Sequence, residues 1–351
     1  MSNLIYTREH EDKYPHAADV LERDYAENGF SKGWALHCKP VPEYFFDCHV
    51  HYGDKKESVS KSVSLFNEQI ANRGVKRALI IFQIYGKKWA PALTDQSIMD
   101  DFPYFTAKEL ESNLDLFKNS GNIFWSAYIN CLSPEKELVH AAADMGARCI
   151  KLHNAPQIEE NSPLDLWYSS DWRDCFEAMA ERKLPVLWHV TQRLPSSVYT
   201  GGGRNAYWIK GWKNGVTYTN EDLLQVFLTC CRRNPGVNFI GAHQLHIGWE
   251  RLDELFTAHH NLYVDSTIGC MLREYDDFYP QDKEFLRSVF IKWSDRILFG
   301  TDSVILDSFN SYSESVYAQH IRFITSLDLP QDVLNKITHG NLERLCNIAK
   351  L

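Results

Sequence analysis

The sequence contains no long hydrophobic run. Its most apolar stretches, such as Ala78–Phe82, are far shorter than the roughly 20 apolar residues that a membrane-spanning helix needs. Residues 1–13 are polar and charged, and they lack the hydrophobic core of a secretory signal peptide. We therefore expect no membrane partner and a cytoplasmic location.

Regular cysteine spacing and basic stretches are also lacking. The nine cysteines are odd in number and scattered, which argues against a disulfide framework and for a reducing compartment. The formal net charge is -9, and no basic stretch offers a surface for phosphates, so we expect no nucleic-acid partner. A small anionic substrate remains compatible with this charge, because it needs only one or two local cations.

The chain does contain short apolar runs that alternate with helix-like segments. Such alternation is typical of βα units with a parallel sheet, and eight runs predict an α/β fold of the (β/α)8 TIM-barrel type. The runs cover residues 44–50, 77–84, 123–129, 147–152, 185–190, 237–242, 261–265 and 296–300. Helical spacing of apolar residues is clearest over 172–183, 223–231 and 284–293.

No internal repeat, low-complexity segment or linker divides this pattern. We therefore expect a single barrel domain over residues 44–351, with residues 1–43 as an N-terminal extension packed on the barrel. Two long loops, 86–106 and 191–220, follow predicted strand ends. Both should lie on the face where barrel enzymes have their active sites.

A pair of histidines follows the first apolar run, in the sequence Asp47-Cys48-His49-Val50-His51. Side chains alternate between the two faces of a strand, so Asp47, His49 and His51 are expected to point the same way. Two imidazoles on one face at a strand end can bind one cation.

Later predicted strands end in further residues of the types that bind metals. His189 lies at the end of the fifth run, and His243 and Asp302 follow directly after the sixth and eighth runs. In a barrel these ends converge, so His49, His51, His189 and Asp302 form a candidate set of three nitrogens and one oxygen. This set suits zinc, and also manganese or iron. His243 is either a further ligand or an acid–base group beside the ion.

The alternative for each residue is a structural role. A single histidine at a strand end is more often an ordinary core or surface residue than a ligand, and 14 histidines place some there by chance. A pair two residues apart, joined by matching residues at three other strand ends, is harder to explain by chance.

These stretches together resemble the amidohydrolase superfamily, and within it the branch of small-acid decarboxylases, hydratases and lactonases. The resemblance implies that His49, His51, His189 and Asp302 hold one divalent metal and that His243 polarises water or a substrate oxygen. It also implies that Asn341 caps the last helix. Relatives usually carry a glycine-rich turn after the position of His243, where this chain has Gln244-Leu245-His246. The matching stretches cover residues 47–51, 149–153, 185–189, 241–243, 299–302 and 339–345.

Lys151 lies at the end of the fourth apolar run. In binuclear relatives a lysine at this place is carboxylated and bridges two metals, whereas Lys151 followed by Leu152-His153 looks more like the mononuclear branch. We expect Lys151 to bind a substrate carboxylate, with a structural ion pair as the alternative. Asp47 and His153 are expected to contact the metal ligands rather than the ion.

The 191–220 loop combines glycines and aromatic residues with positive charges that include Arg193 and Arg204. One interpretation is a lid whose arginines bind an anionic substrate. The other is a contact in a homo-oligomer, because Trp and Tyr are enriched at interfaces.

These residues predict a metal-dependent hydrolase that uses a metal-activated water to cleave an amide, lactone or ester bond of a small, anionic molecule. The first alternative is a metal-dependent, non-oxidative decarboxylase of a small unsaturated or aromatic acid. A catalytically silent, metal-binding barrel is the remaining one.

Overall fold

The computed structural model describes residues 42–52, 64, 74–84, 104–105, 121–191, 218, 220–247, 249–267, 280–305, 317, 320–321 and 323–351. The N-terminal extension up to residue 41 and most of both long loops lie outside the described residues. The packing of that extension on the barrel, and the extent of the single domain, therefore stay predictions.

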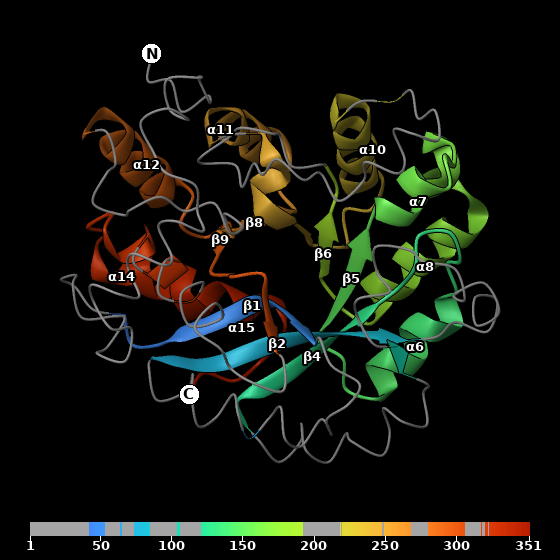
Figure 1. Ribbon diagram of the computed structural model, residues 1–351, viewed down its shortest axis with the longest axis horizontal. Helices are drawn as coiled ribbons and strands as arrows, with labels where there is room; N and C mark the ends of the chain where they lie inside the picture. The colour runs from blue at the N-terminus through green and yellow to red at the C-terminus, as the bar shows by residue number, and fades with distance from the viewer. Residues whose placement is uncertain are drawn as a thin grey trace.

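Parallel strands form the centre of the molecule, and the helices lie around them (Figure 1). Each strand pairs in parallel with the next, which confirms the eight apolar runs and the (β/α)8 barrel. The eight are β1 (Phe45–Tyr52), β2 (Val75–Ile84), β4 (Ile123–Tyr128), β5 (Cys149–His153), β6 (Val186–His189), β7 (Phe239–Gly241), β8 (Leu262–Asp265) and β9 (Ile297–Leu298).

Two short strands were not predicted. β3 (Tyr104–Phe105) pairs with β2, and β10 (Ser303–Ile305) pairs with β1. β10 continues the eighth strand after a break at residues 299–302, so the eighth position contacts β8 through β9 and β1 through β10. Within the break, the backbone N–H of Cys48 donates to the carbonyl of Phe299 at 3.0 Å. The barrel therefore closes through an interrupted strand.

The helices between the strands match the predicted periodic segments. Segments 172–183, 223–231 and 284–293 correspond to α8 (Ser170–Glu181), α10 (Asn220–Arg233) and α12 (Pro280–Lys292). In the described part of the chain, no helix combines the length and the apolar character needed to cross a membrane. The other described helices are α6 (Lys136–Asp144), α7 (Ala155–Glu159), η3 (Leu164–Tyr168), η4 (Ala242–His246), α11 (Trp249–Ala258), α14 (Gln331–Asn335), η6 (Lys336–Gly340) and α15 (Asn341–Leu345).

Side chains that point into the barrel change character along each strand. On β5, Cys149 belongs to the apolar cluster inside the barrel, and Lys151 and His153 follow it on the same face. On β6, Leu187 belongs to that cluster and His189 follows it. Because the strands are parallel, these polar side chains gather at one end of the barrel, which we call the mouth.

An irregularity in β1 decides which of its side chains reach the mouth. Asp47 pairs with Ala78, whose side chain lies in the apolar cluster outside the barrel, as does that of Val50. The pairing with β2 shifts between Asp47 and Val50, so β1 carries one extra residue there. The prediction that Asp47 shares a face with His49 and His51 is therefore wrong, because the bulge turns only the histidines inward.

The end of the barrel opposite the mouth is filled by the C-terminal segment. Leu342, Leu345 and Cys346 pack into the cluster inside the barrel. Next to them, Nη1 of Arg77 lies 2.6 Å from Oε1 of Glu343, and both side chains are buried. Arg77 also donates to the carbonyl of Ala349 at 2.7 Å, so this ion pair ties β2 to the end of the chain.

Asn341 does not cap the last helix, contrary to the prediction. Helical backbone runs from Gln331 through a π-helical turn at Lys336–Gly340 into α15, so Asn341 lies inside a continuous helical segment. Its amide instead donates to the carbonyls of Ser294 and Ile297, at 2.6 and 2.8 Å. These bonds anchor the C-terminal segment to the start of the eighth strand.

Replacing Arg77 by Met should destabilise the protein by about 3–5 kcal/mol, because Glu343 would remain buried without its cation. The matched control is Lys336→Met, which removes an exposed pair with Asp295 and should change stability by less than about 1 kcal/mol. Denaturant unfolding measures both. In the double variant Arg77→Met/Glu343→Met the loss should be smaller than in Arg77→Met alone, and a larger loss would contradict this assignment.

Candidate metal centre

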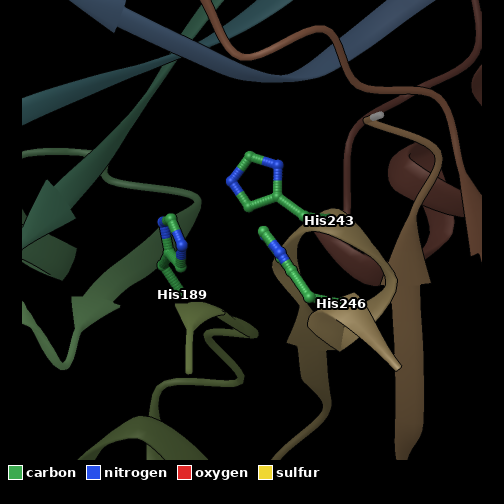
Figure 2. Close-up of side chains that lie close together, drawn as sticks. All are labelled: His189, His243 and His246. Atoms are coloured by element: carbon green, nitrogen blue, oxygen red, sulfur yellow. The ribbon is translucent and has the colours of Figure 1, made fainter. Parts of the chain in front are cut away.

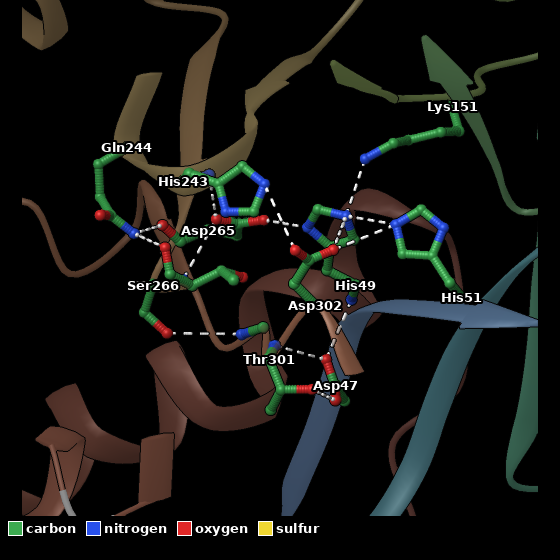
Figure 3. A network of polar contacts seen from close by, with 12 residues as sticks. Asp47, His49, His51, Lys151, His243, Gln244, Asp265, Ser266, Thr301 and Asp302 are labelled. Carbon is green, nitrogen blue, oxygen red and sulfur yellow. Dashed lines mark hydrogen bonds and ion pairs between the residues drawn. The ribbon is translucent and has the colours of Figure 1, made fainter. Parts of the chain in front are cut away.

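Three side-chain atoms of the mouth lie close together (Figure 3). Nε2 of His49 is 3.2 Å from Nε2 of His51, and each of these nitrogens is 3.1 Å from Oδ1 of Asp302. Four ligands arranged tetrahedrally at about 2.0–2.1 Å from a zinc ion would be about 3.3 Å apart. The three atoms already have nearly this spacing, so the residues fit a divalent metal.

Burial keeps three imidazoles of the mouth neutral. It lowers the pKa of His51 to about 4 and those of His153 and His189 well below the usual value. A neutral imidazole has a lone pair available for a metal. Burial alone would raise the pKa of Asp302, but His49, His243 and His51 together outweigh it and hold that pKa well below its usual value. The mouth therefore offers three neutral imidazoles and an ionised carboxylate.

The backbone brings Asp302 to this place. Its φ of +56° lies in the left-handed region, which is uncommon for residues other than glycine and occurs most often with Asn and Asp. Two residues earlier, a Cβ on Gly300 would lie 2.8 Å from Oγ1 of Thr267 and 3.0 Å from Sγ of Cys48. The interrupted strand can therefore approach β1 and β8 closely only with glycine at position 300.

Asp265, at the end of β8, is a site residue that the sequence analysis missed. Its Oδ2 lies 2.8 Å from Nδ1 of His49, and its Oδ1 accepts hydrogen bonds from the backbone N–H groups of His243 and Thr267, at 2.7 and 3.2 Å. A carboxylate on the far nitrogen of a ligand histidine fixes the ring and its tautomer. Its position at the end of the seventh apolar run was the available signal, since every other ligand candidate also ends a run.

Lys151 points into the same group of atoms. Its Nζ lies 2.8 Å from Nε2 of His49, and the whole residue is buried. Burial lowers the pKa of Lys151 to about 8, although the charges of Asp302 and Asp265 act in the opposite direction. Among the described residues, the mouth thus holds one buried amine beside the three candidate ligands.

His189 lies in a different group, with His243 and His246 (Figure 2). The ring nitrogens of these three buried residues lie within 4.8 Å of one another. His243 links this group to the first, because its Nε2 is 3.8 Å from Oδ2 of Asp302. The ring of His153, predicted to contact the ligands, lies 4.2 Å from that of His189, centroid to centroid.

His246 was also missed by the sequence analysis. Residues 243–246 all have positive φ, between +52° and +58°, and form one left-handed turn after β7. Nothing in a run of non-glycine residues indicates such a turn, so the sequence contains no signal that His246 would face His243. Relatives were expected to use glycines here, and in this chain the turn forms without them.

Asp47 supports the site from outside the barrel. Its carboxylate accepts hydrogen bonds from the backbone N–H of His49 at 3.0 Å and from the N–H and hydroxyl of Thr301, at 3.1 and 2.6 Å. Burial raises the pKa of Asp47 to about 7. The residue joins β1 to the interrupted strand immediately beside His49 and Asp302.

Arg193 and Arg204, the predicted substrate contacts, lie outside the described residues.

Solved structures with this fold include enzymes of different reactions. The 5-carboxyvanillate decarboxylase of Novosphingobium aromaticivorans, solved with manganese, matches with a TM-score of 0.54 and 12% identity over 87% of this chain and 96% of that one. The 2,6-dihydroxybenzoate decarboxylase from Rhizobium matches with a TM-score of 0.52 and 13% identity over 87% of this chain and 99% of that one. A probable 2-pyrone-4,6-dicarboxylic acid hydrolase from Acinetobacter baumannii matches with a TM-score of 0.50 and 12% identity over 87% of this chain and 99% of that one. At these identities the likeness establishes the fold alone.

The search of curated proteins found no match. The sequence profile of a family described as amidohydrolase matches residues 46–347, from β1 to just beyond α15. This match agrees with the resemblance noted in the sequence and with the strand-end positions of the candidate ligands. The chain belongs to the amidohydrolase family.

Proposed function

We propose that this protein is a metal-dependent hydrolase that cleaves an amide, lactone or ester bond of a small, anionic molecule. The proposal rests mainly on one observation: the 3.1–3.2 Å spacing of His49 Nε2, His51 Nε2 and Asp302 Oδ1 at the barrel mouth. Membership of the amidohydrolase family supports it.

In this proposal His49, His51 and Asp302 hold one divalent metal, and His189 turns toward them as the fourth ligand. Zinc is the first candidate, because it combines readily with imidazole nitrogen and carboxylate oxygen. Manganese or iron would also accept this set. When bound, such an ion lowers the pKa of a coordinated water from about 15.7 to about 7, which supplies a nucleophile at neutral pH.

Asp302 and His243 are the proposed catalytic residues. Asp302 is ionised and therefore able to accept a proton from water and pass it to the leaving group. His243 Nε2 lies 3.8 Å from Oδ2 of Asp302, so a substrate oxygen bound between them would be within reach of its imidazole. A hydrogen bond from that ring would stabilise negative charge developing on the oxygen.

Lys151 is the proposed binding group for a substrate carboxylate. Among the described lysines, only Lys151 is found in contact with a candidate metal ligand. Its Nζ lies 2.8 Å from Nε2 of His49. A buried ammonium favours an anionic partner strongly, because little water screens the attraction. This preference is the reason for expecting an acidic substrate.

Decarboxylation is the second candidate, and two of the structural neighbours named above are decarboxylases of aromatic acids. The same residues could serve it: Lys151 and the metal ligands would bind and orient the acid, and a protonated His243 would deliver a proton to carbon. A screen of small carboxylic acids, lactones and amides by mass spectrometry separates the reactions. Gain of water supports hydrolysis, and loss of carbon dioxide assigns the protein to the second candidate.

Replacing Asp302 by Asn should abolish turnover and weaken metal binding while leaving the fold intact. Asn tolerates the left-handed backbone at this position but lacks the charge. Metal analysis of the purified protein should give about one tightly bound equivalent in the parent. A metal-free parent, or a variant with normal turnover, would contradict the proposed function.

Replacing Asp265 by Asn should lower metal affinity by about 10–100-fold, because His49 would lose the carboxylate that orients its ring. Competition with a chelator measures the affinity, and near-ultraviolet circular dichroism checks the fold. The matched control is Asp253→Asn, since the carboxylate of Asp253 bonds only to Lys292 and Trp293 among the contacts found and lies on the surface. Equal metal affinities for the Asp265 variant and the parent would show that Asp265 does not support the metal site.

Replacing Lys151 by Met should reduce kcat/KM for a carboxylate substrate by a factor of about 30 or more, which corresponds to 2 kcal/mol or more for a buried charge contact. The loss should be much smaller for the corresponding neutral ester or amide of the same molecule. Lys183→Met, on an exposed turn after α8, is the control. An equal loss for charged and neutral substrates would show that Lys151 does not bind the carboxylate.

A further inference from the structure

The ring of His153, at the end of β5, has its proton on a defined nitrogen. The backbone N–H of Ala155 donates to Nδ1 of His153 at 2.9 Å. Because an amide N–H can only donate, Nδ1 uses its lone pair in this bond and carries no proton. An imidazole ring carries at least one proton, which therefore lies on Nε2. His153 is thus a hydrogen-bond donor through Nε2 and offers no lone pair there to a metal.

This donor lies in the barrel mouth. Lys151 and His153 follow Cys149 on the inner face of β5, and His153 is buried. The ring centroid of His153 lies 4.2 Å from that of His189. After burial, the charges of Lys151 and His51 contribute most to the lowered pKa of His153, which places the ring near both residues. His153 is therefore beside the candidate metal centre without being one of its ligands.

The end of β5 is held rigidly around His153. The backbone N–H of Asn154 donates to the carbonyl of His189 at 3.1 Å, which continues the pairing of β5 with β6. The side-chain oxygen of Asn154 accepts a hydrogen bond from the indole of Trp188 at 2.7 Å, and Trp188 is fully buried. A donor that is fixed before a ligand arrives loses little freedom on binding, which favours its use in recognition.

We propose that His153 is a specificity-determining residue whose Nε2–H donates to an oxygen atom of the substrate. Lys151, the proposed carboxylate-binding group, places its Nζ among the metal ligands, 2.8 Å from Nε2 of His49 (Figure 3). His153 follows two residues later on the same face, so its backbone lies roughly 7 Å further along the strand. Two donors at different depths fit a small acid that carries a second oxygen acceptor, either another carboxylate or a hydroxyl group.

This inference deepens the proposed function, on which it rests for the carboxylate that Lys151 binds. A simple monocarboxylic acid offers no acceptor to the N–H of His153, and a donor that loses water without gaining a partner weakens binding. A hydrogen bond to a charged acceptor corresponds to about 10–100-fold in affinity, and one to a neutral acceptor to less. The mouth should therefore select acids with two oxygen functions.

The test compares acids of equal carbon number that differ at the far end. The probes are succinate, 4-hydroxybutyrate and butyrate, and the five-carbon set glutarate, 5-hydroxyvalerate and valerate. Calorimetry measures their binding to the metal-loaded, full-length protein. His153→Asn keeps an acceptor for the N–H of Ala155 but has no donor at the place of Nε2. In at least one set it should weaken the dicarboxylate about 10–100-fold and leave the monocarboxylate within about twofold.

Two further variants complete the comparison. His153→Gln places an amide N–H near the position of Nε2 and should restore most of the affinity for the dicarboxylate. His260→Asn changes an exposed histidine outside the mouth and should change no affinity. A loss for the dicarboxylate alone in His153→Asn identifies a second carboxylate as the acceptor, and a loss for the hydroxy acid as well identifies any oxygen. If all acids of both sets keep their affinities, or none binds the parent, the proposal is overturned.

Nuclear magnetic resonance tests the ring directly, without turnover. In protein labelled with ¹⁵N-histidine, the His153 signal, identified by its loss in the Asn variant, should show a proton on Nε2 and none on Nδ1. The Nε2 signal should also shift when the dicarboxylate is added. A proton on Nδ1, or a signal that the acid does not move, overturns the proposal. If His153→Asn does not fold, His153→Phe takes its place in both experiments.

Lys151→Met separates this proposal from the proposed function. This variant should weaken the monocarboxylate and the dicarboxylate of one set alike, because both present the carboxylate that Lys151 binds. If Lys151→Met changes neither affinity, the carboxylate contact of the proposed function fails, whereas a selective loss in His153→Asn would still assign the second contact to His153.

Discussion

The carboxylate of Asp265 joins the two halves of the barrel mouth. One oxygen contacts the ring of His49, and the other accepts a hydrogen bond from the backbone of His243. His49 belongs to the group that includes Asp302, and His243 to the group that includes His246. A single buried side chain therefore sets the orientation of a candidate ligand ring and the start of the left-handed turn. The spacing of both groups depends on it.

The mouth is also where the chain departs most from regular backbone. β1 carries a bulge beside His49, the eighth strand is interrupted before Asp302, and the turn after β7 is left-handed over four residues. Each departure changes the direction of a side chain that regular strands would send elsewhere. Without the bulge, for example, Asp47 and His49 would lie on the same face, whereas Asp47 now lies outside the barrel and His49 inside. The irregularities are thus the means by which ordinary strand ends become a compact polar site.

The sequence predicts the barrel well because strand and helix signals are local. An apolar run bounded by polar residues marks a strand wherever it occurs, and a ligand-type residue after such a run must lie near the mouth. His49, His51 and Asp302 could be placed together on this basis. The bulge, the role of Asp265 and the turn that brings in His246 depend on contacts between β1, β7 and β8, which no local pattern encodes. Asn341 was misjudged for a similar reason: its partners, Ser294 and Ile297, lie far from it in sequence.

The two ends of the barrel differ in how their buried charges are balanced. Opposite the mouth, Arg77 and Glu343 are each other's counter-charge, and apolar residues of the C-terminal segment fill the remaining space. Among the described residues of the mouth, imidazoles and the amine of Lys151 outnumber the carboxylates that touch them. An added cation is accommodated by the lone pairs of the rings, and an added anion by Lys151. A substrate that brings a carboxylate to a metal-loaded mouth therefore completes the charge balance, whichever of its bonds is then broken.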